Sequence, residues 1–249
     1  MRPTAVPSDS VPDIAMRPVR AAVASTVVAD QQRSALDALD LAQVNASLRD
    51  QAPREIVRWA ASLQRRAIVT TSMGINAAAT LHAVCSEIPE VPVVWVDHGF
   101  NVAETYRVAE ALTAELRLNL HVANPTMTAA RLTARLGGIP RPEDTESHRW
   151  FTEQVKLLPF QRALDHWQPE IWFSGIRREE TAFRRHLDIV SRDDRGLLRI
   201  APFFYWREQE VTQYVAQHGL PTARHYFDPT KGSDNRECGL HTQSTRLSA

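Results

Sequence analysis

The stretch Ala67-Ile68-Val69-Thr70-Thr71-Ser72-Met73-Gly74-Ile75-Asn76 decides the fold. Its first four residues form a short apolar run that predicts a buried parallel strand. A turn of small hydroxyl residues with one glycine follows, and the alanine-rich residues 77–84 favour a helix. Such a turn can bind an anion, because free N–H groups and hydroxyls converge where the helix dipole is positive. An ordinary capped turn is the commoner meaning of this pattern, and both interpretations stay open.

Strand-like segments recur along the chain, with helix-forming segments between them. Residues 91–97 (Val-Pro-Val-Val-Trp-Val-Asp) predict a second buried strand, and residues 118–122 predict a third. Further strands are predicted over 170–176 and 197–202. A repeated strand–helix–strand order requires parallel strands joined by right-handed crossovers. The predicted fold class is therefore α/β, a doubly wound, mostly parallel sheet with helices on both faces.

Apolar residues at helical spacing predict the helices. Two helices should precede the first strand, over about 31–49 and from Pro53. Besides the helix over 77–84, four more are expected later in the chain, over 104–116, 129–136, from Trp150 to Leu164, and 206–218. Lys156 lies inside the predicted helix that begins near Trp150, where a lone lysine is usually a solvated surface charge. Beyond Pro221 no regular element is expected.

Small and polar residues follow the first two predicted strands. Ser72 and Gly74 come after the first strand, and Asp97 and Gly99 come after the second. Ligands of open α/β sheets bind beyond the carboxyl ends of the strands. We therefore expect these four residues to gather at one edge of the sheet and to bind the ligand.

Four arginines follow the strand predicted over 170–176, namely Arg177, Arg178, Arg184 and Arg185. Guanidinium groups bind phosphate or sulfate oxygens bidentately, so this position suits a polyanionic ligand. The alternative is a charged helix face on which glutamates 179 and 180 pair with the arginines. Their place just after a strand favours the ligand.

Composition limits the class of protein. The chain has 249 residues with 29 basic and 29 acidic side chains, so its charge does not favour nucleic acid or a membrane surface as a partner. No apolar run is long enough for a membrane span, and Cys85 and Cys238 give no disulfide framework. A cytoplasmic location is expected. The histidines follow no recognised ligand spacing, so no metal is predicted, and a homodimer is left open.

The predicted domain organisation has three parts. Residues 1–25 contain four prolines and no sustained periodicity, which predicts a mobile leader. Residues 26–220 should form a single α/β nucleotide-binding domain that includes the two N-terminal helices. Residues 221–249 are predicted to be a flexible tail that carries Cys238.

Cys238 is the candidate nucleophile. Arg236 and His241 flank it, and nearby positive charge stabilises the thiolate, which is the form of cysteine that attacks electrophiles. The alternative is an exposed cysteine without a chemical role. Cys85, within an alanine-rich predicted helix, is most simply a small buried apolar residue.

The segment Arg236-Glu237-Cys238-Gly239-Leu240-His241 resembles the C-terminal signature of the phosphoadenylyl-sulfate (PAPS) and adenylyl-sulfate (APS) reductases. Further stretches resemble that family in the same order, namely Thr71–Ile75, Asp97-His98-Gly99 through Glu104-Thr105-Tyr106, Trp172–Glu179, Pro202–Trp206 and His218-Gly219-Leu220. The resemblance covers about residues 67–241. It implies an adenine nucleotide α-hydrolase-like fold.

The resemblance also implies a reaction. Ser72 and Gly74 would hold the nucleotide, and Lys156, Arg177, Arg178 and His241 would face the phosphosulfate, with Arg184 and Arg236 as further candidates for binding it. Cys238 would attack the sulfur and form an S-sulfocysteine, from which thioredoxin or glutaredoxin would release sulfite. Adenosine 3′,5′-bisphosphate would be the other product.

The cysteine content selects between the two substrates. The APS reductases of this family hold a [4Fe-4S] cluster on four cysteines, and this chain has only two. The cluster-free, PAPS-specific branch is therefore predicted, with no bound cofactor. The segment between Leu220 and Arg236 is shorter than the family pattern, so three alternatives stay open: an APS reductase, another nucleotide-cleaving enzyme on the same scaffold, and a non-catalytic nucleotide-binding protein.

Overall fold

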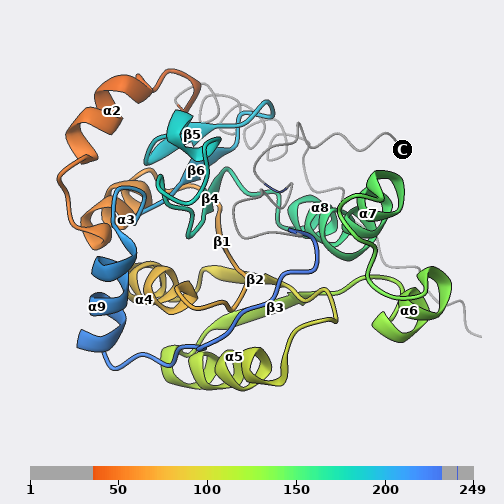
Figure 1. Ribbon diagram of the computed structural model, residues 1–249. Helices are drawn as coiled ribbons and strands as arrows, with labels where there is room; N and C mark the ends of the chain where they lie inside the picture. Colours follow the sequence, from red (N-terminus) through yellow and green to blue (C-terminus); the bar gives the residue numbers. More distant parts are fainter. Residues whose placement is uncertain (1–35, 232–239, 241–249) are drawn as a thin grey trace, which may run out of the picture. The chain divides into compact units, whose positions relative to one another are not determined.

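The computed structural model describes residues 36–231 and Leu240 (Figure 1). The chain divides into two compact units, Met1–Asp40 and Leu41–Ala249, and all structural statements below concern the second. The predicted leader over residues 1–25 lies outside the described residues, as does most of the predicted tail. The proposed division into leader, domain and tail stays a prediction.

A six-stranded sheet forms the centre of the described part of the chain. Its order is β3-β2-β1-β4-β6-β5, and the strands are β1 (Ala67–Thr71), β2 (Pro92–Val96), β3 (Asn119–Ala123), β4 (Ile171–Phe173), β5 (Val190–Arg192) and β6 (Leu198–Ile200). Every neighbouring pair is parallel except β5 and β6. At the centre, Val69 of β1 is in register with Val93 of β2 and Phe173 of β4.

Helices cover both faces of this sheet. They are α2 (Leu41–Leu48), α3 (Pro53–Ser62), α4 (Ala77–Glu87), α5 (Ala103–Leu116), α6 (Ala129–Leu136), α7 (Thr145–Thr152), α8 (Leu158–Trp167) and α9 (Glu208–Gln217). Helix α4 contacts β1, α3, α5 and α9, whereas α8 contacts β2 and β3 (Figure 1). None of the described helices is long and apolar enough to cross a membrane.

The alternation of side chains along the strands explains why two helical layers are needed. Ile68, Val94 and Trp172 are buried in one cluster with Phe160 and Leu164 of α8. Successive residues of a strand point to opposite faces, so the neighbours of these residues lie on the other face, and that face is also buried. Both faces must therefore be covered by helices. The predicted doubly wound α/β fold is confirmed.

The structure adds a strand that the sequence did not predict. Strand β5 has only three residues, Val-Ser-Arg, which is too short a pattern to identify. It is held by tertiary contacts: Asn45 Nδ2 donates to Val190 O at 2.9 Å, and Val190 N–H donates to Asn45 Oδ1 at 2.8 Å. The carboxamide thereby replaces a neighbouring strand at the edge of the sheet.

Two helix predictions are corrected. Within the described residues, the helix expected over about 31–49 is interrupted at residues 38–40, and α2 begins at Leu41. The single helix expected from Trp150 begins earlier, at Thr145, and is interrupted by a π-helical turn over Glu153–Leu157. This turn contains Lys156, and π-helical turns are frequent at functional sites.

The strand order locates the point where the chain changes direction across the sheet. From β1 the chain proceeds outward through β2 to β3, and then crosses to β4 on the other side of β1. The switch point therefore lies between β1 and β4, where ligands of doubly wound sheets bind beyond the carboxyl ends. The loops that follow β1, β2 and β4 all start at this edge.

Candidate active site

The loop after β1 forms one side of the carboxyl edge. Met73 has a left-handed backbone conformation (φ 53°), and its N–H donates to Thr71 Oγ1 at 3.0 Å. The Met73 side chain is fully buried, whereas Ser72 is exposed. The loop is therefore anchored through Met73 and keeps Ser72 at the surface, beside the N-terminus of α4.

Gly74 has a steric role in this loop. It is buried, and a Cβ atom at this position would lie 3.1 Å from Tyr226 Cγ and 3.2 Å from Ser72 Oγ. A side chain here would crowd an aromatic ring and the preceding hydroxyl, which would have to shift slightly. Tyr226, which comes from much later in the chain, therefore lies directly over the loop.

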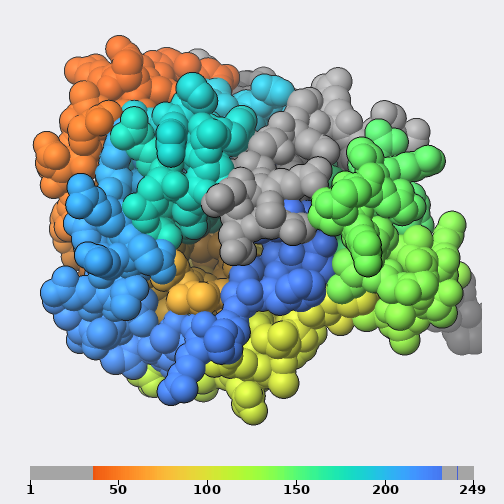
Figure 2. All heavy atoms as spheres, in the orientation of Figure 1, coloured from red at the N-terminus to blue at the C-terminus, as the bar shows by residue number. Residues whose placement is uncertain are grey.

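Residues 221–231, which we call the crossing segment, run across the carboxyl edge after α9 (Figure 1). Thr222 Oγ1 donates to Ile75 O at 2.6 Å, and Arg224 N–H donates to Glu104 Oε1 at 3.0 Å. In Figure 2 the amber atoms of the β1–α4 region are recessed between the blue crossing segment and the teal residues that follow β4. The crossing segment contains no helix or strand, as predicted.

Asp97 shapes the loop after β2. Its Oδ1 accepts hydrogen bonds from Gly99 N–H at 2.9 Å, Asn101 Nδ2 at 2.8 Å and Tyr106 OH at 3.1 Å. Gly99 has a positive φ of 79°, which glycine adopts without strain. Both residues lie at the predicted edge. Their observed contacts build the loop, and a direct role in binding stays a prediction.

His98 is almost completely buried, with 2% of its surface exposed. Its Nδ1 accepts a hydrogen bond from Phe100 N–H at 3.0 Å, and its Nε2 has no hydrogen-bond partner among the described residues. Burial, aided by the nearby charge of Lys156, lowers the pKa of His98 to about 4, although Asp228 and Asp97 act in the opposite direction. The imidazole is therefore neutral near pH 7, and its proton lies on Nε2.

Lys156 is buried rather than solvated, so the surface-charge interpretation is wrong. From the π-helical turn, its Nζ donates to Asp228 Oδ2 and, at 3.4 Å, to Thr230 Oγ1. Asp228 Oδ1 also accepts from Thr230 N–H at 3.0 Å and from Thr230 Oγ1 at 2.6 Å. Burial alone would raise the pKa of Asp228, but the charge and hydrogen bond of Lys156, with the bonds from Thr230, lower it to about 2.

Arg177 and Arg184 form a second cationic group at the edge, with 4% and 5% of their surfaces exposed. Arg177 pairs with Glu179, with Glu208 of α9 and, at 3.6 Å, with Glu180. Arg184 pairs with Glu180 as well. The two arginines are thus joined through one carboxylate.

The helical alternative for the arginine segment is correct about the partners and wrong about the conformation. Glutamates 179 and 180 do pair with the arginines, but the segment contains turns and a 3₁₀ turn over Arg184–His186 instead of an α-helix. Arg178 is exposed, and its Cζ lies 6.0 Å from the centre of the Tyr205 ring. It does not join the buried arginines.

Glu208 connects the loops after β1 and β4. It accepts hydrogen bonds from Asn76 Nδ2 at 3.0 Å to each carboxylate oxygen, and it also pairs with Arg177. The N-terminus of α9 therefore links the two loops that flank the switch point.

The predicted nucleophile and its flanking residues, Arg236, Cys238 and His241, lie outside the described residues. Leu240 is described, and it packs against the buried apolar cluster that includes Ile68, Val94 and Trp172. Cys85 is buried in α4, and burial raises the pKa of its thiol to about 12. The prediction that Cys85 is a buried apolar residue is confirmed.

The family model of the phosphoadenosine phosphosulfate reductase domain matches residues 66–228, from the start of β1 to Asp228. The chain belongs to this reductase family. A phosphoadenosine 5′-phosphosulfate reductase from a Synechococcus species is 37% identical over 183 residues, which is 73% of this chain and 78% of that protein. Another from Proteus mirabilis is 32% identical over 235 residues, covering 85% of this chain and 94% of its own length.

A solved structure shows the same fold. The PAPS reductase from Candida auris, in a phosphate complex, superposes with a TM-score of 0.63 at 20% sequence identity, over 72% of this chain and 86% of its own. At this identity the similarity establishes the fold alone. The adenine nucleotide α-hydrolase-like fold implied by the resemblance is confirmed.

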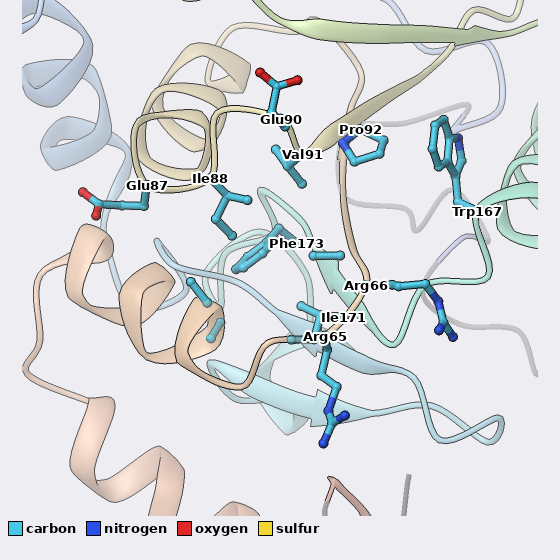
Figure 3. Close-up of a pocket in the computed structure, with 13 residues that line it drawn as sticks. Arg65, Arg66, Glu87, Ile88, Glu90, Val91, Pro92, Trp167, Ile171 and Phe173 are labelled. Atoms are coloured by element: carbon cyan, nitrogen blue, oxygen red, sulfur yellow. The ribbon is translucent and has the colours of Figure 1, made fainter. Parts of the chain in front are cut away.

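A pocket of about 480 Å³ lies at the opposite, amino edge of the sheet (Figure 3). It is lined by residues at the starts of three strands, including Pro92 and Ile171, together with Ile88 and Phe173. In Figure 3 the charged ends of Arg65, Arg66 and Glu90 point away from the apolar side chains. A polyanionic nucleotide needs converging cations, so this pocket is not the site expected for a member of the reductase family.

Sequence reasoning missed several residues at the carboxyl edge of the sheet. They are His98, as a buried donor, and Tyr226, Asp228, Thr230 and Glu208. Their proximity to the edge depends on tertiary contacts. No group of three or more potential metal ligands occurs among the residues that the structure describes.

Proposed function

We propose that this protein reduces PAPS to sulfite and adenosine 3′,5′-bisphosphate, with thioredoxin or glutaredoxin as the reductant. Membership of the reductase family supports this proposal, and the relatives named above carry the name of that activity. The single observation that carries it for this chain is the gathering of buried cations at one edge of the sheet. Arg177 is linked through Glu208 to the loop after β1, and Lys156 is paired with Asp228 of the crossing segment.

The proposed reaction has two steps. The Cys238 thiolate attacks the sulfur of the phosphosulfate, the sulfur–oxygen bond to phosphate breaks, and adenosine 3′,5′-bisphosphate leaves with that electron pair. The product on the protein is an S-sulfocysteine. A redoxin thiolate then attacks Cys238 Sγ and expels sulfite, and the second redoxin thiol resolves the mixed disulfide. The redoxin is thereby oxidised to its disulfide and Cys238 returns to the thiolate.

The positive charges at the edge suit the first step. Displacement at sulfur brings an anionic nucleophile toward an anionic group, so permanent cations must neutralise the phosphosulfate oxygens. Arg177, Arg184 and Lys156 are buried and held in position before any ligand arrives. Such preorganisation lowers the cost of ordering the site when the substrate binds.

PAPS is preferred over APS because two cysteines cannot supply the four thiolates of a cubane cluster. No bound cofactor is needed for the proposed reaction. The redoxin partner, the homodimer and a cytoplasmic location stay predictions.

The test measures sulfite release from PAPS by the purified full chain with thioredoxin and a reductant. The matched variants are Cys238→Ser and Cys85→Ala, because the buried Cys85 thiol should play no part. Sulfite should form with the wild type and with Cys85→Ala, and Cys238→Ser should form none. Mass spectrometry after PAPS without reductant should find a sulfonate adduct on Cys238. Equal activity of the wild type and Cys238→Ser would overturn the proposal.

A further inference from the structure

The buried Lys156 already has an anion bound to it in the structure. Asp228 is 8% exposed, and its two oxygens accept hydrogen bonds from Lys156 Nζ and from the backbone and hydroxyl of Thr230. A second anion placed beside this pair would face a negative charge in a poorly solvated site, which is unfavourable. An anionic substrate can therefore use Lys156 only if Asp228 moves away.

His98 offers a buried hydrogen-bond donor that the Asp228 carboxylate does not use. Its Nδ1 is occupied by Phe100 N–H, which fixes the proton on Nε2, and Nε2–H has no partner among the described residues. Phe100, whose N–H bonds to this ring, packs against the cluster that contains Val155, the residue before Lys156. The charges of Asp228 and Lys156 both act on the pKa of the ring. A buried donor without an acceptor is costly, and such groups are rare unless a ligand uses them.

The crossing segment that carries Asp228 is attached to the edge through loop contacts. Upstream of Asp228 it is joined by the hydroxyl of Thr222 to Ile75 O and by the N–H groups of Arg224 and His225 to Glu104. It contains no helix or strand, so a displacement of Asp228 breaks no regular ladder of backbone hydrogen bonds. Local movement of this kind of segment costs less than movement of the sheet or of a helix.

We propose that Asp228 is a built-in anion that occupies the place of the substrate's phosphosulfate group. The substrate exchanges with the carboxylate, pairs with Lys156, and accepts the hydrogen bond that His98 Nε2–H leaves unused. This inference rests on the proposed function for the identity of the substrate. Exchange keeps an anion against the buried cation both before and after binding.

Binding of PAPS to full-length Cys238→Ser protein tests the exchange, since this background cannot turn the substrate over. Replacing Asp228 by Asn removes the competing anion, and affinity for PAPS should rise roughly tenfold because less of the protein is in the blocked state. Replacing His98 by Asn keeps an acceptor for Phe100 N–H but has no donor at the position of Nε2, so affinity should fall about tenfold. Asp194→Asn, on the exposed turn between β5 and β6, should change nothing.

A second variant covers the case in which Asp228→Asn does not fold because Lys156 loses its partner. Thr230→Val removes the hydroxyl that donates to Asp228 at 2.6 Å and leaves both charges in place. It should loosen the carboxylate and raise affinity for PAPS about threefold, in proportion to the larger population of the open state. Unchanged or weaker binding in both Asp228→Asn and Thr230→Val would overturn the exchange.

Inorganic sulfate separates this inference from the proposed function, because it tests the binding of an anion beside Lys156 without a nucleotide. Sulfate should raise the thermal midpoint of Asp228→Asn and Thr230→Val more than that of the wild type. If PAPS does not bind and sulfate still discriminates among the variants, the proposed function fails and the exchange stands. Equal sulfate effects in all three proteins would contradict the exchange.

Discussion

The two cationic groups at the edge of the sheet differ in the burial of their carboxylate partners. The side chains of Lys156 and Asp228 are 8% and 3% exposed, so both members of that pair are removed from water. The Arg177 side chain is similarly buried, at 5%, but its partner Glu208 is 53% exposed. We call Lys156 and Asp228 the closed pair, because both charges are buried. In the second group a buried cation faces exposed carboxylates, which form a solvated rim.

This difference decides how each group can respond to change. A buried charge that loses a buried charged partner is left with a large uncompensated cost of desolvation. Arg177 is shared among Glu208 and two further glutamates, and water can replace one of them. Lys156 should therefore accept only a one-for-one exchange of anions, whereas Arg177 should tolerate the loss of one partner.

Breaking the closed pair should have the largest effect. Lys156→Met leaves the Asp228 carboxylate buried without its cation, and we expect the free energy of unfolding to fall by about 3–5 kcal/mol. Urea denaturation of the full chain measures this loss. The control is Lys231→Met at the other lysine of the chain, which is only partly buried and should cost less than about 1 kcal/mol.

A double variant checks the physical reason for that loss. Lys156→Met combined with Asp228→Leu removes both charges, and apolar replacement of a buried ion pair is often neutral or stabilising. The double variant should therefore be more stable than Lys156→Met alone. If the two are equally destabilised, packing rather than charge holds the site together.

The pH dependence of stability should be the second largest effect. It tests how far water is excluded from the surroundings of Lys156 and His98. Burial lowers the pKa of His98 from 6.5 to about 4. Above pH 6.5 the ring is neutral in both states and contributes nothing. As the pH falls from 6.5 toward 4, His98 binds a proton in the unfolded chain but not in the folded protein. The free energy of unfolding therefore falls, by about 3 kcal/mol for this shift.

Denaturation of His98→Asn across the same pH range isolates this contribution. Asn keeps the acceptor for Phe100 N–H and does not titrate. The variant should keep only the weaker slope from other groups such as His82, whose pKa burial also lowers. Identical slopes in the wild type and the variant would show that His98 is well solvated.

Loss of one acid from the arginine group should have the smallest effect. Glu208→Gln removes an exposed partner of Arg177 and keeps an acceptor for Asn76 Nδ2. We expect the free energy of unfolding to fall by less than about 1 kcal/mol, since the remaining glutamates and water compensate. Thermal unfolding at low and high salt provides the measurement, and a loss comparable to that of Lys156→Met would erase the contrast between the groups.

Local patterns were sufficient where burial alone decides the element. The apolar β-branched runs that became β1 and β2, and the alanine-rich α4, follow from their own composition. Strand β5 was missed because three residues carry no periodicity. Its backbone hydrogen bonds are made to Asn45 of α2, which is 145 residues away in the sequence. The arginine segment was not a helix, and there Arg177 pairs with Glu208 of α9 as well as with glutamates 179 and 180 of its own segment.

The candidate site divides in the same way. The loop after β1, the acid after β2 and the arginines after β4 could be predicted because parallel strands bring their carboxyl ends to one edge. The partner of Lys156 could not, because Asp228 is 72 residues away and reaches it only when the crossing segment folds over the edge. The burial of His98 could not be seen for the same reason.

The sequence by itself determined the α/β order, the family, and the edge at which a nucleotide should bind. These follow from local composition and from the fixed geometry of parallel strands. Only the tertiary structure decided that Lys156 lies in a dry environment against Asp228 while Arg177 faces a solvated rim. Burial and charge pairing depend on which distant segments meet, and no local pattern in the chain records that meeting.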